Sequence, residues 1–445
     1  MTKLATRFLT SSFLAGALTA PAYAITPVAS DNVVLFWQQV LQSTPVGPPP
    51  VVARDIAMAN VAIHDAVNAT VGNTDKSYLG AISNQGGDTR AAASVAAHNV
   101  LVQVDPANAA TYDAALSASL ALVANGSAKT KGMATGAAFA SAMIAKRAND
   151  GTAGNVFSVP TGAIGAYAPQ VPGPPGAVFQ QLATATPFVM TSASQFRAAP
   201  PPAINSAAYT AAYNEVKDIG SAASGTRTAD QTAATLFWNP LHGDDGWIQA
   251  AIDQSKPKNW TALQYAGMFA TLSAGVEDAV IAAWDDKVHY DFWRPITAIQ
   301  NGAIDGNTNT LGDPNWNPLL DTGAVPFQSY ISAHSVVNST AATILDAYLG
   351  NSNQFCLVSG TSRCWSGFDA AALESGLSRE WGGIHFSFDV SAGISTGQGL
   401  GQYILTRNPF GAVPEPQSWV LMIGGIAAIG AAMRRRRCGL ASSWA

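Results

Sequence analysis

The chain has 445 residues, with 23 Lys and Arg against 28 Asp and Glu, so its formal net charge is −5 at pH 7. This acidic balance argues against nucleic-acid binding, which needs a basic surface. Hydrophobic residues make up 48% of the chain, so it can bury one large core or two packed units. Charged residues make up only 11%, so a local cluster of cations would be unusual and would call for a functional explanation.

The first 24 residues have the three parts of a secretory signal peptide. Lys3 and Arg7 give a positively charged start, residues 13–20 form an apolar stretch, and residues 22–24 (Ala-Tyr-Ala) are a small-residue cleavage site. We therefore expect residues 1–24 to be removed on export. The alternative is a buried first helix of the folded protein.

Apolar residues then recur at helical spacing through the middle of the chain, for example at Ile56, Ile63 and Val67, whereas alternating strand patterns are scarce. The pattern predicts an all-α protein. We expect its helices at 54–69, 127–149, 205–220, 228–238, 259–286, 334–349 and 384–406.

Long connections rich in Pro and Gly separate these helices. The stretch from 151 to 202 is too long for an ordinary connection, so we expect a wrapping loop or a lid there. It also suggests a division of the catalytic region, 25–413, into an N-terminal helical part (about 25–200) and a part that bears the site (about 201–413).

Three cysteines occur, and two of them, Cys356 and Cys364, flank a short loop. In an oxidising compartment they would form a local disulfide, and the alternative is two free thiols. Two cysteines alone do not make a metal site. The third, Cys438, lies in the C-terminal tail.

The C-terminus carries its own targeting pattern. Residues 414–416 (Pro-Glu-Pro) precede an apolar run that ends at Met433, and four arginines follow at 434–437. The run is short for a full membrane span, which needs about 20 residues, and the arginines would stay on the cytoplasmic side. This order resembles the PEP-CTERM sorting signal of Gram-negative bacteria, whose members are exported and processed by an exosortase. An ordinary single-span membrane anchor is the alternative.

Either interpretation of the tail places the catalytic region outside the cytoplasm, in the periplasm, at the cell surface or in the extracellular matrix. Loss of 1–24 removes Lys3 and Arg7, and loss of 414–445 removes Glu415 and four arginines. The remainder has 17 basic and 27 acidic residues and a net charge of −10. A cationic pocket would be a local exception on such a protein.

Three short stretches near the end of this region gather cations and histidines. Lysine and arginine supply fixed positive charge and many donors, serine adds a hydroxyl, and histidine can ligate, attack or move protons. Together these groups are suited to binding a tetrahedral oxyanion. The residues of this kind in the three stretches are Lys287, Arg294, Ser332, His334, Arg379 and His385.

The order Lys-six residues-Arg-Pro, then Ser-x-His, then Ser-Arg-five residues-His resembles the vanadium-dependent haloperoxidases, which share it with the type 2 phosphatidic acid phosphatases. Stretches such as 61–69, 195–202 and 290–298 extend the resemblance over about residues 50–410 and favour the haloperoxidase branch. The resemblance implies an all-α fold of two packed four-helix bundles. It also implies vanadate as cofactor and hydrogen peroxide and halide as partners, with the organic acceptor left open.

By resemblance, Lys287 and Arg294 bind equatorial oxygens of vanadate. They are seven residues apart, so they would share one helix face if the helix runs through Trp293, and Pro295 would then mark its end or a kink. The alternative for both cations is a solvated surface pair.

Ser332 precedes an apolar helical run, so it would sit at a helix N-terminus, where backbone amides and the helix dipole favour anions. By resemblance Ser332 binds one oxygen, the Ala333 amide helps to hold another, and His334 is the acid/base group. A simple N-cap is the alternative for Ser332. The family's Pro and Gly in this block are replaced by Ile331 and Ala333, which puts affinity and rate in question.

Glycines 382 and 383 predict a turn that brings Arg379 and His385 to one anion. By resemblance Arg379 neutralises oxygens and His385 is the axial ligand of vanadium. Asp389 lies four residues further and would share a helical face with His385, accept its other ring N–H and fix its tautomer. A solvated carboxylate is the alternative for Asp389.

The same residues leave other functions open. In an acid phosphatase of this superfamily, His385 would be the nucleophile. The sorting tail, together with Ile331 and Ala333, also fits a non-catalytic protein of the extracellular matrix. The remaining histidines, such as His64 and His98, are expected to be structural.

Overall fold

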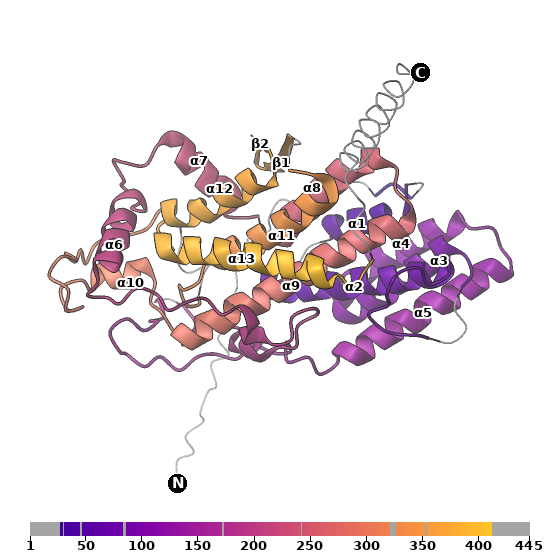
Figure 1. The fold of residues 1–445 in the computed structure, drawn as a ribbon, viewed down its shortest axis with the longest axis horizontal. Coiled ribbons are helices and arrows are strands. Elements are labelled where there is room, and N and C mark those ends of the chain that lie inside the picture. The colour runs from indigo at the N-terminus through magenta and orange to yellow at the C-terminus, as the bar shows by residue number, and fades with distance from the viewer. Residues whose placement is uncertain are drawn as a thin grey trace, which may run out of the picture.

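The computed structural model describes residues 27–29, 31–44, 47–82, 86–170, 173–241, 243–320, 326–351 and 354–411. Helices take 59% of the chain and strands 3%, which confirms the predicted all-α class. The signal peptide predicted over 1–24 and the tail predicted over 414–445 lie outside the described residues. In Figure 1 the N-terminal helices gather at one end of an elongated molecule, and the C-terminal helices occupy the middle and the other end.

The N-terminal helices pack through small side chains. Helices α2, α3 and α5 contact one another, and α1 and α4 contact α3. Gly136 of α5 lies so close to α3 that an added Cβ would stand 2.2 Å from the Ala92 carbonyl oxygen, so only glycine permits this approach. The helices are α1 (Val33–Ser43), α2 (Pro49–Thr70), α3 (Thr89–Val104), α4 (Ala109–Ala121) and α5 (Ser127–Arg147).

Helix α9 (Ala262–Tyr290) is the centre of the molecule, because it packs on α2 from the N-terminal group and on α11 from the C-terminal group. Thr261 and Gln264 form a capping box at its start. It is long and apolar enough to cross a membrane, yet its apolar window is entirely buried inside the protein. These contacts are those of a core helix.

Helix α9 runs four residues beyond its predicted end at 286 but stops before Trp293. Asp291 follows it in the left-handed region, with φ 44°, and the chain turns away. Pro295 is the first residue of α10 (Pro295–Gln300), and Arg294 is its N-cap. The condition for a shared helix face, a helix that runs through Trp293, is therefore not met, and Lys287 and Arg294 lie on different elements. Proline fits the first turn because that position needs no N–H donor.

The C-terminal helices form the second packed group. Helix α11 contacts α8, α9, α12 and α13, so it lies inside this group. Helices α6, α7 and α10 lie toward the end of the molecule away from α3 and α5 (Figure 1). The helices are α6 (Ala207–Ile219), α7 (Ala229–Trp238), α8 (Gly243–Ser255), α11 (Ala333–Leu349), α12 (Phe368–Trp381) and α13 (Ser387–Arg407).

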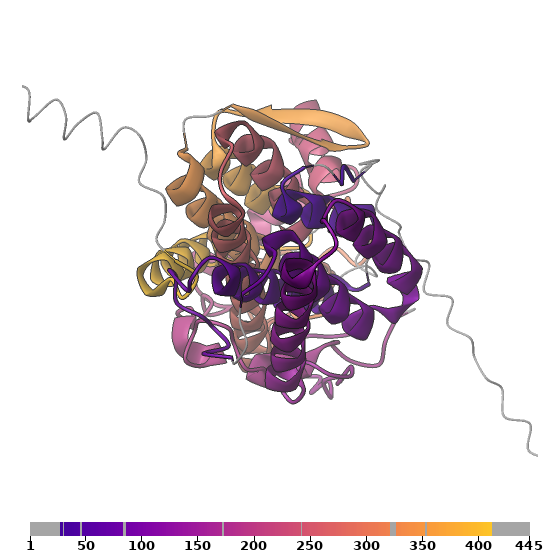
Figure 2. The same ribbon diagram turned by 90° about the vertical axis from the view of Figure 1, so that its right-hand side faces the viewer.

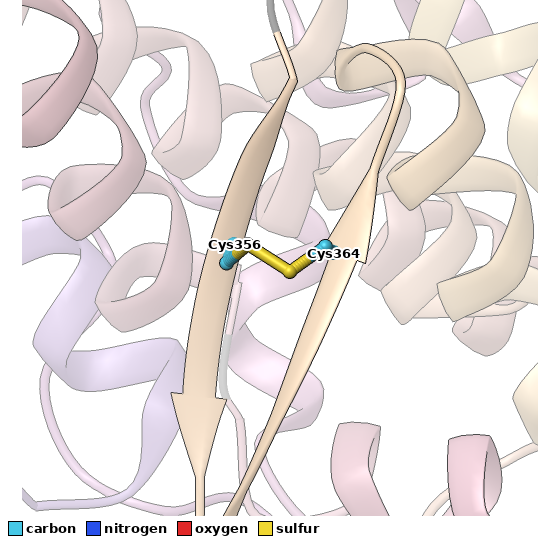
Figure 3. Close-up of a disulfide and its surroundings, with 2 residues drawn as sticks. All are labelled: Cys356 and Cys364. Atoms are coloured by element: carbon cyan, nitrogen blue, oxygen red, sulfur yellow. A yellow bond between two sulfur atoms is a disulfide. The ribbon is translucent and has the colours of Figure 1, made fainter.

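Strands β1 (Phe355–Ser359) and β2 (Thr361–Trp365) form an antiparallel hairpin in which Cys356 pairs with Cys364. The two cysteines form the expected disulfide (Figure 3). The hairpin lies on the outer surface (Figure 2), and Arg363 ties it down through Glu374 of α12 at 2.7 Å and Asp230 of α7 at 2.9 Å. The disulfide agrees with an oxidising compartment.

The long connection between α5 and α6 wraps around α9. The carboxylate of Asp278 on α9 accepts three successive backbone N–H groups of this connection, from residues 188–190, at 2.6 to 2.8 Å. Arg197 then binds Asp285 with two hydrogen bonds of 2.7 Å. The prediction of a wrapping loop agrees with these contacts. The division of the catalytic region near residue 200 stays a prediction.

The seven helices expected from the pattern are present, with ends that differ by a few residues. Helices α1, α3, α4, α8, α10 and α12 were not expected. Helix α3 shows why: its buried alanines at 91–93, 96 and 97 cover more than one narrow stripe. Alanine also gives little contrast between a buried and an exposed face, so the apolar period is weak.

Candidate functional site

Five different elements bring the predicted residues together. Lys287 lies in the last turn of α9, Arg294 caps α10, Ser332 caps α11, Arg379 lies in the last turn of α12, and His385 lies between α12 and α13. Direct contacts join several of them. Arg294 Nη1 is 3.0 Å from His385 Nε2, and the Ser332 N–H donates to the backbone carbonyl of Asp389 at 3.1 Å.

Two buried guanidinium groups lack carboxylate partners. Arg294 is 1% exposed and donates to the carbonyls of Phe327 and Ile384, but its Nη2 has no hydrogen-bond partner among the described residues. Arg379 is 2% exposed, and within the same residues its Nε and Nη1 have none. Its Nη2 has only the amide oxygen of Asn239, at 3.5 Å. Buried donors without partners are costly, so these groups call for an anion.

The pKa values report the same excess of charge. Burial, and to a smaller extent the nearby Arg294, lowers the pKa of Arg379 to about 9. Burial lowers the pKa of Arg294 to about 10, against a smaller opposite effect of Asp389. Both groups remain cations at neutral pH, and a bound oxyanion would relieve their mutual repulsion.

The hydrogen bonds of His385 fix its tautomer. An arginine only donates, so the contact from Arg294 Nη1 requires a lone pair on His385 Nε2. The proton therefore sits on Nδ1 and is donated to Asp389 Oδ2 at 2.9 Å. Burial and then the surrounding cations Arg294 and Lys287 hold the pKa of His385 well below its usual value, which favours this neutral form. The result is a nitrogen lone pair among unpaired guanidinium donors.

Asp389 is the hub that orients this histidine. Its Oδ2 accepts from His385 Nδ1, from the Phe386 N–H at 3.2 Å and from Ser329 Oγ at 2.5 Å. Burial raises the pKa of Asp389, partly offset by the Ser329 hydrogen bond and by Lys287. The contact with His385 is the one expected, but the geometry differs. His385 precedes α13, so the two residues do not share a helical face.

Lys287 is bound differently from the arginines. Its ammonium group donates to three backbone carbonyls, those of Gln328, Ser329 and Ile331, at 2.7 to 3.1 Å. These bonds use all three of its protons and fix the loop before α11. Burial, then Arg294, holds the pKa of Lys287 well below its usual value. A direct bond from Lys287 to an oxyanion would require one of the three carbonyls to be released.

Ser332 and Ala333 form the start of α11. The Ser332 side chain accepts from the Ser335 N–H at 3.4 Å, which makes it the N-cap. The first amides of the helix, including that of Ala333, have no intrahelical acceptor and lie at the positive end of the helix dipole. Ala333 is helical, so this position does not need the conformational freedom of glycine. His334 follows on the first turn and is half-buried.

Two residues that support the site were not expected from the sequence. Ser329 lies in the loop before α11 and is fully buried against Asp389, and Asn239 follows α7 and contacts Arg379. Neither belongs to a motif with a chemical signal of its own. They approach the site only through the folding of distant segments.

The donor set suits an oxyanion rather than a metal cation. Among the described residues, no group of three or more His, Cys, Asp and Glu side chains is placed to hold a metal ion. Of the other histidines, His64 is fully buried between Asp65 and Asp75, and His98 contacts Asp113 at the surface. These contacts agree with the structural roles expected for both.

Comparison with known proteins gives the family of the site-bearing half. Residues 267–409 match the model of the second helical-bundle domain of vanadium chloroperoxidase, and residues 412–437 match the PEP-CTERM protein-sorting motif. The vanadium chloroperoxidase of Curvularia inaequalis is 24% identical over 188 residues, which cover 36% of this chain and 30% of the fungal enzyme. The match thus spans about a third of that relative's length.

Solved structures match over most of the chain. A bacterial vanadium-dependent iodoperoxidase covers 86% of this chain and 97% of its own, with 24% identity and a TM-score of 0.71. A bacterial vanadium-dependent chloroperoxidase in its holo form covers 82% of this chain and 94% of its own, with 18% identity and a TM-score of 0.66. At these identities the likeness establishes the fold.

Proposed function

Because this chain has the vanadium haloperoxidase fold and its residues 267–409 match that family's second helical bundle, it belongs to the vanadium haloperoxidase family, and we propose that it is an exported vanadate-dependent haloperoxidase. In this proposal the enzyme uses hydrogen peroxide to oxidise a halide to hypohalous acid. Vanadate is its cofactor, and the organic acceptor is unassigned.

One observation carries the proposal: the buried guanidinium groups of Arg294 and Arg379 keep donors that have no partner among the described residues, beside the Nε2 lone pair of His385, which accepts from Arg294 Nη1. Vanadate is a tetrahedral oxyanion that expands to five coordination, so it needs cationic donors for its oxygens and one nitrogen ligand. These residues supply both. Among the described side chains no carboxylate is hydrogen-bonded to Arg294 or Arg379, and the nearby Asp389 already accepts from three donors.

Each residue then has a distinct role. His385 Nε2 is the vanadium ligand, and Arg294 and Arg379 bind oxygens. Ser332 and the Ala333 amide bind a further oxygen at the start of α11. Bound vanadate supplies a Lewis acid that activates peroxide toward halide without changing its oxidation state. The remaining roles belong to the chain: Asp389 holds the tautomer of His385, His334 moves protons, and Lys287 fixes the carbonyls of the loop that precedes Ser332.

A paired assay tests the proposal. The purified protein is measured with and without added vanadate, for halogenation of a phenol probe with peroxide and halide and for phosphate release from a simple ester. We expect halogenation that requires vanadate, peroxide and halide together and that is lost in His385→Ala. Folded protein that binds vanadate yet halogenates nothing with chloride, bromide or iodide would exclude the proposal.

A phosphatase is the second candidate, and the lone pair on His385 Nε2 favours it. The same nitrogen can attack a phosphate ester, and the same guanidinium groups can stabilise the five-coordinate transition state. Turnover of the ester without vanadate, lost in His385→Ala, would assign this function instead. A third candidate, a non-catalytic matrix protein, rests on Ile331 and Ala333 and would be rejected by either turnover.

The PEP-CTERM motif indicates a surface or exported protein that is sorted by an exosortase. We propose in addition that the signal peptide is cleaved after Ala24 and that the tail anchors the protein in the membrane until it is processed. The mass and N-terminal sequence of the protein recovered from a Gram-negative host that carries an exosortase would test both cuts. A mature chain that begins at Met1 would contradict the first.

A further inference from the structure

The folded body ends at a tightly held junction. Phe410 is 1% exposed and packs its ring against His64 and Tyr78, with centroid distances of 5.5 and 6.1 Å. An added Cβ on Gly411 would stand 2.4 Å from a carboxylate oxygen of Asp75, so the two touch. The sorting motif begins at the next residue, 412. The end of the folded body, where the sorting motif begins, is therefore fixed on the body's surface by these contacts.

Exposed cations surround this junction. Lys146 places its Nζ 4.8 Å from the centre of the Tyr78 ring, and Lys76 directly follows Asp75. Arg407, in the last turn of α13, lies over Tyr403 at 5.4 Å. All three cations are exposed, and both tyrosines are half-buried. We call Lys76, Lys146 and Arg407, with the two tyrosines, the basic rim.

The basic rim is an exception on an acidic protein. The processed chain would have a net charge of −10, yet residues 390–411 and 254–276 contain no acidic residue. Both segments lie at the junction, because Thr271 Oγ1 contacts Asn408 and the backbone of Phe410 closely approaches Gly267. Two carboxylates lie close by: Asp65 bonds the imidazole of His64 at 2.9 Å and accepts the Leu79 N–H, and Asp75 faces the same imidazole at 3.6 Å. Positive charge is thus concentrated where the tail leaves the body.

We propose that the basic rim docks the folded body onto the anionic headgroups of a bilayer while the sorting tail is still attached. The apolar part of the tail begins at Trp419, eight positions after Gly411, and this stretch of chain spans at most about 30 Å. The rim is therefore held near any membrane that the tail enters. Lysine and arginine attract anionic lipid, and tyrosine rings favour the headgroup region. This inference rests on the sorting tail and not on the vanadate chemistry.

The experiment uses the full chain reconstituted into vesicles of phosphatidylcholine alone or of phosphatidylcholine mixed with phosphatidylglycerol. Amine-reactive labelling of individual lysines is read by mass spectrometry. We expect Lys76 and Lys146 to label about fivefold more slowly on the anionic vesicles, since each basic residue near such a surface gains roughly that factor in binding. Salt at about 1 M should abolish the difference, because it screens the charges.

Lys131 is the internal control, since it lies on the same helix, α5, about 22 Å from Lys146. Its labelling should not depend on the lipid. Arg407→Glu should restore much of the labelling of Lys76 and Lys146, whereas Lys131→Glu should leave their protection unchanged, with the thermal midpoint of each variant confirming the fold.

Three outcomes would overturn the inference. Equal labelling of Lys76 and Lys146 on both lipids excludes headgroup contact. Equal protection of Lys131 indicates general adsorption without a docking face. Protection that appears only when an exosortase is added to the vesicles assigns the face to that protein. Loss of halogenation in any of these samples bears on the proposed function and not on this result.

Discussion

At the scale of single residues, the site depends on which polar atoms have partners. Lys287 is fully satisfied by three carbonyls, whereas the guanidinium groups of Arg294 and Arg379 are not. In the proposed function the two arginines are therefore the principal anion-binding groups. Asn239 contacts Arg379 with a neutral amide, so it leaves the charge of Arg379 uncompensated. Asp389 accepts from Nδ1 of His385, so the nitrogen that faces the arginines is Nε2.

The neutral side chain of Asn239 leaves the charge of Arg379 available. Asn239→Asp keeps the shape and places a carboxylate beside Arg379 Nη2, where a salt bridge would form. We expect the affinity for phosphate or vanadate to fall about tenfold, or ~1.4 kcal/mol, as measured by calorimetry. Asn315→Asp, which makes the same change at an exposed position, should have little effect. Equal loss in both variants would point to net charge alone.

Asp389→Asn tests the tautomer of His385. The amide can donate to Nδ1, which would move the ring proton to Nε2 and remove the lone pair from the pocket. We expect vanadate affinity and turnover to fall by about 10- to 100-fold, with the fold preserved. Imidazole nitrogen chemical shifts of His385 should report the change of tautomer. Unchanged shifts would contradict this role, and Asp218→Asn at an exposed position is the control.

At the scale of elements, α9 joins the two groups of helices and carries an unusual number of buried charges. Asp278, Asp285 and Asp286 are held by the connection that wraps around the helix. Glu277 is different, because it is fully buried and neither carboxyl oxygen has a hydrogen-bond partner among the described residues. Burial raises its pKa well above the usual value.

Glu277 should therefore make the stability of α9 depend on pH. Its folded pKa lies above its unfolded pKa, so its contribution to stability is complete below about pH 4.5 and is lost as the pH rises through the folded pKa. Glu277→Gln removes this loss. We expect the thermal midpoint of the variant to exceed that of the wild type by a few degrees at pH 8 and to differ little at pH 4. A constant difference across this range would show that the carboxyl titrates normally.

At the scale of the whole molecule, two helical groups share α9, and the site lies where elements from residues 239 to 389 converge. Burying the uncompensated arginines lowers the free energy of unfolding, and the packing of the rest of the fold must offset this loss. A chain cut at both predicted sites would carry a net charge of −10, so we expect oxyanions to be attracted by the buried arginines and the basic rim and not by the protein as a whole.

Oxyanion binding should stabilise the whole fold. Phosphate stands in for vanadate and binds only the native state, so the gain in unfolding free energy is about 2.7 kcal/mol at a concentration of 100 times Kd. We expect the thermal midpoint to rise with phosphate in the wild type and not in Arg379→Ala. Chloride at the same ionic strength is the control. An equal rise with chloride would indicate a general salt effect.

Sequence alone predicted the helical class, the disulfide partners and the residues that gather around His385, because each leaves a local or spaced chemical pattern. It left open whether one helix carries both Lys287 and Arg294, since the left-handed residue at Asp291 ends α9 without a glycine to signal it. It also missed the helices whose alanines blur the apolar period.

Only the tertiary structure decided which site residues already have hydrogen-bond partners and which have donors left for a ligand. The three carbonyls that hold Lys287, the Ser329 hydroxyl on Asp389 and the amide of Asn239 beside Arg379 come from loops far apart in the chain. Whether a donor already has a hydrogen-bond partner or is free to bind a ligand depends on which acceptors folding places within about 3 Å of it. These distances cannot be inferred from the spacing of residues along the sequence.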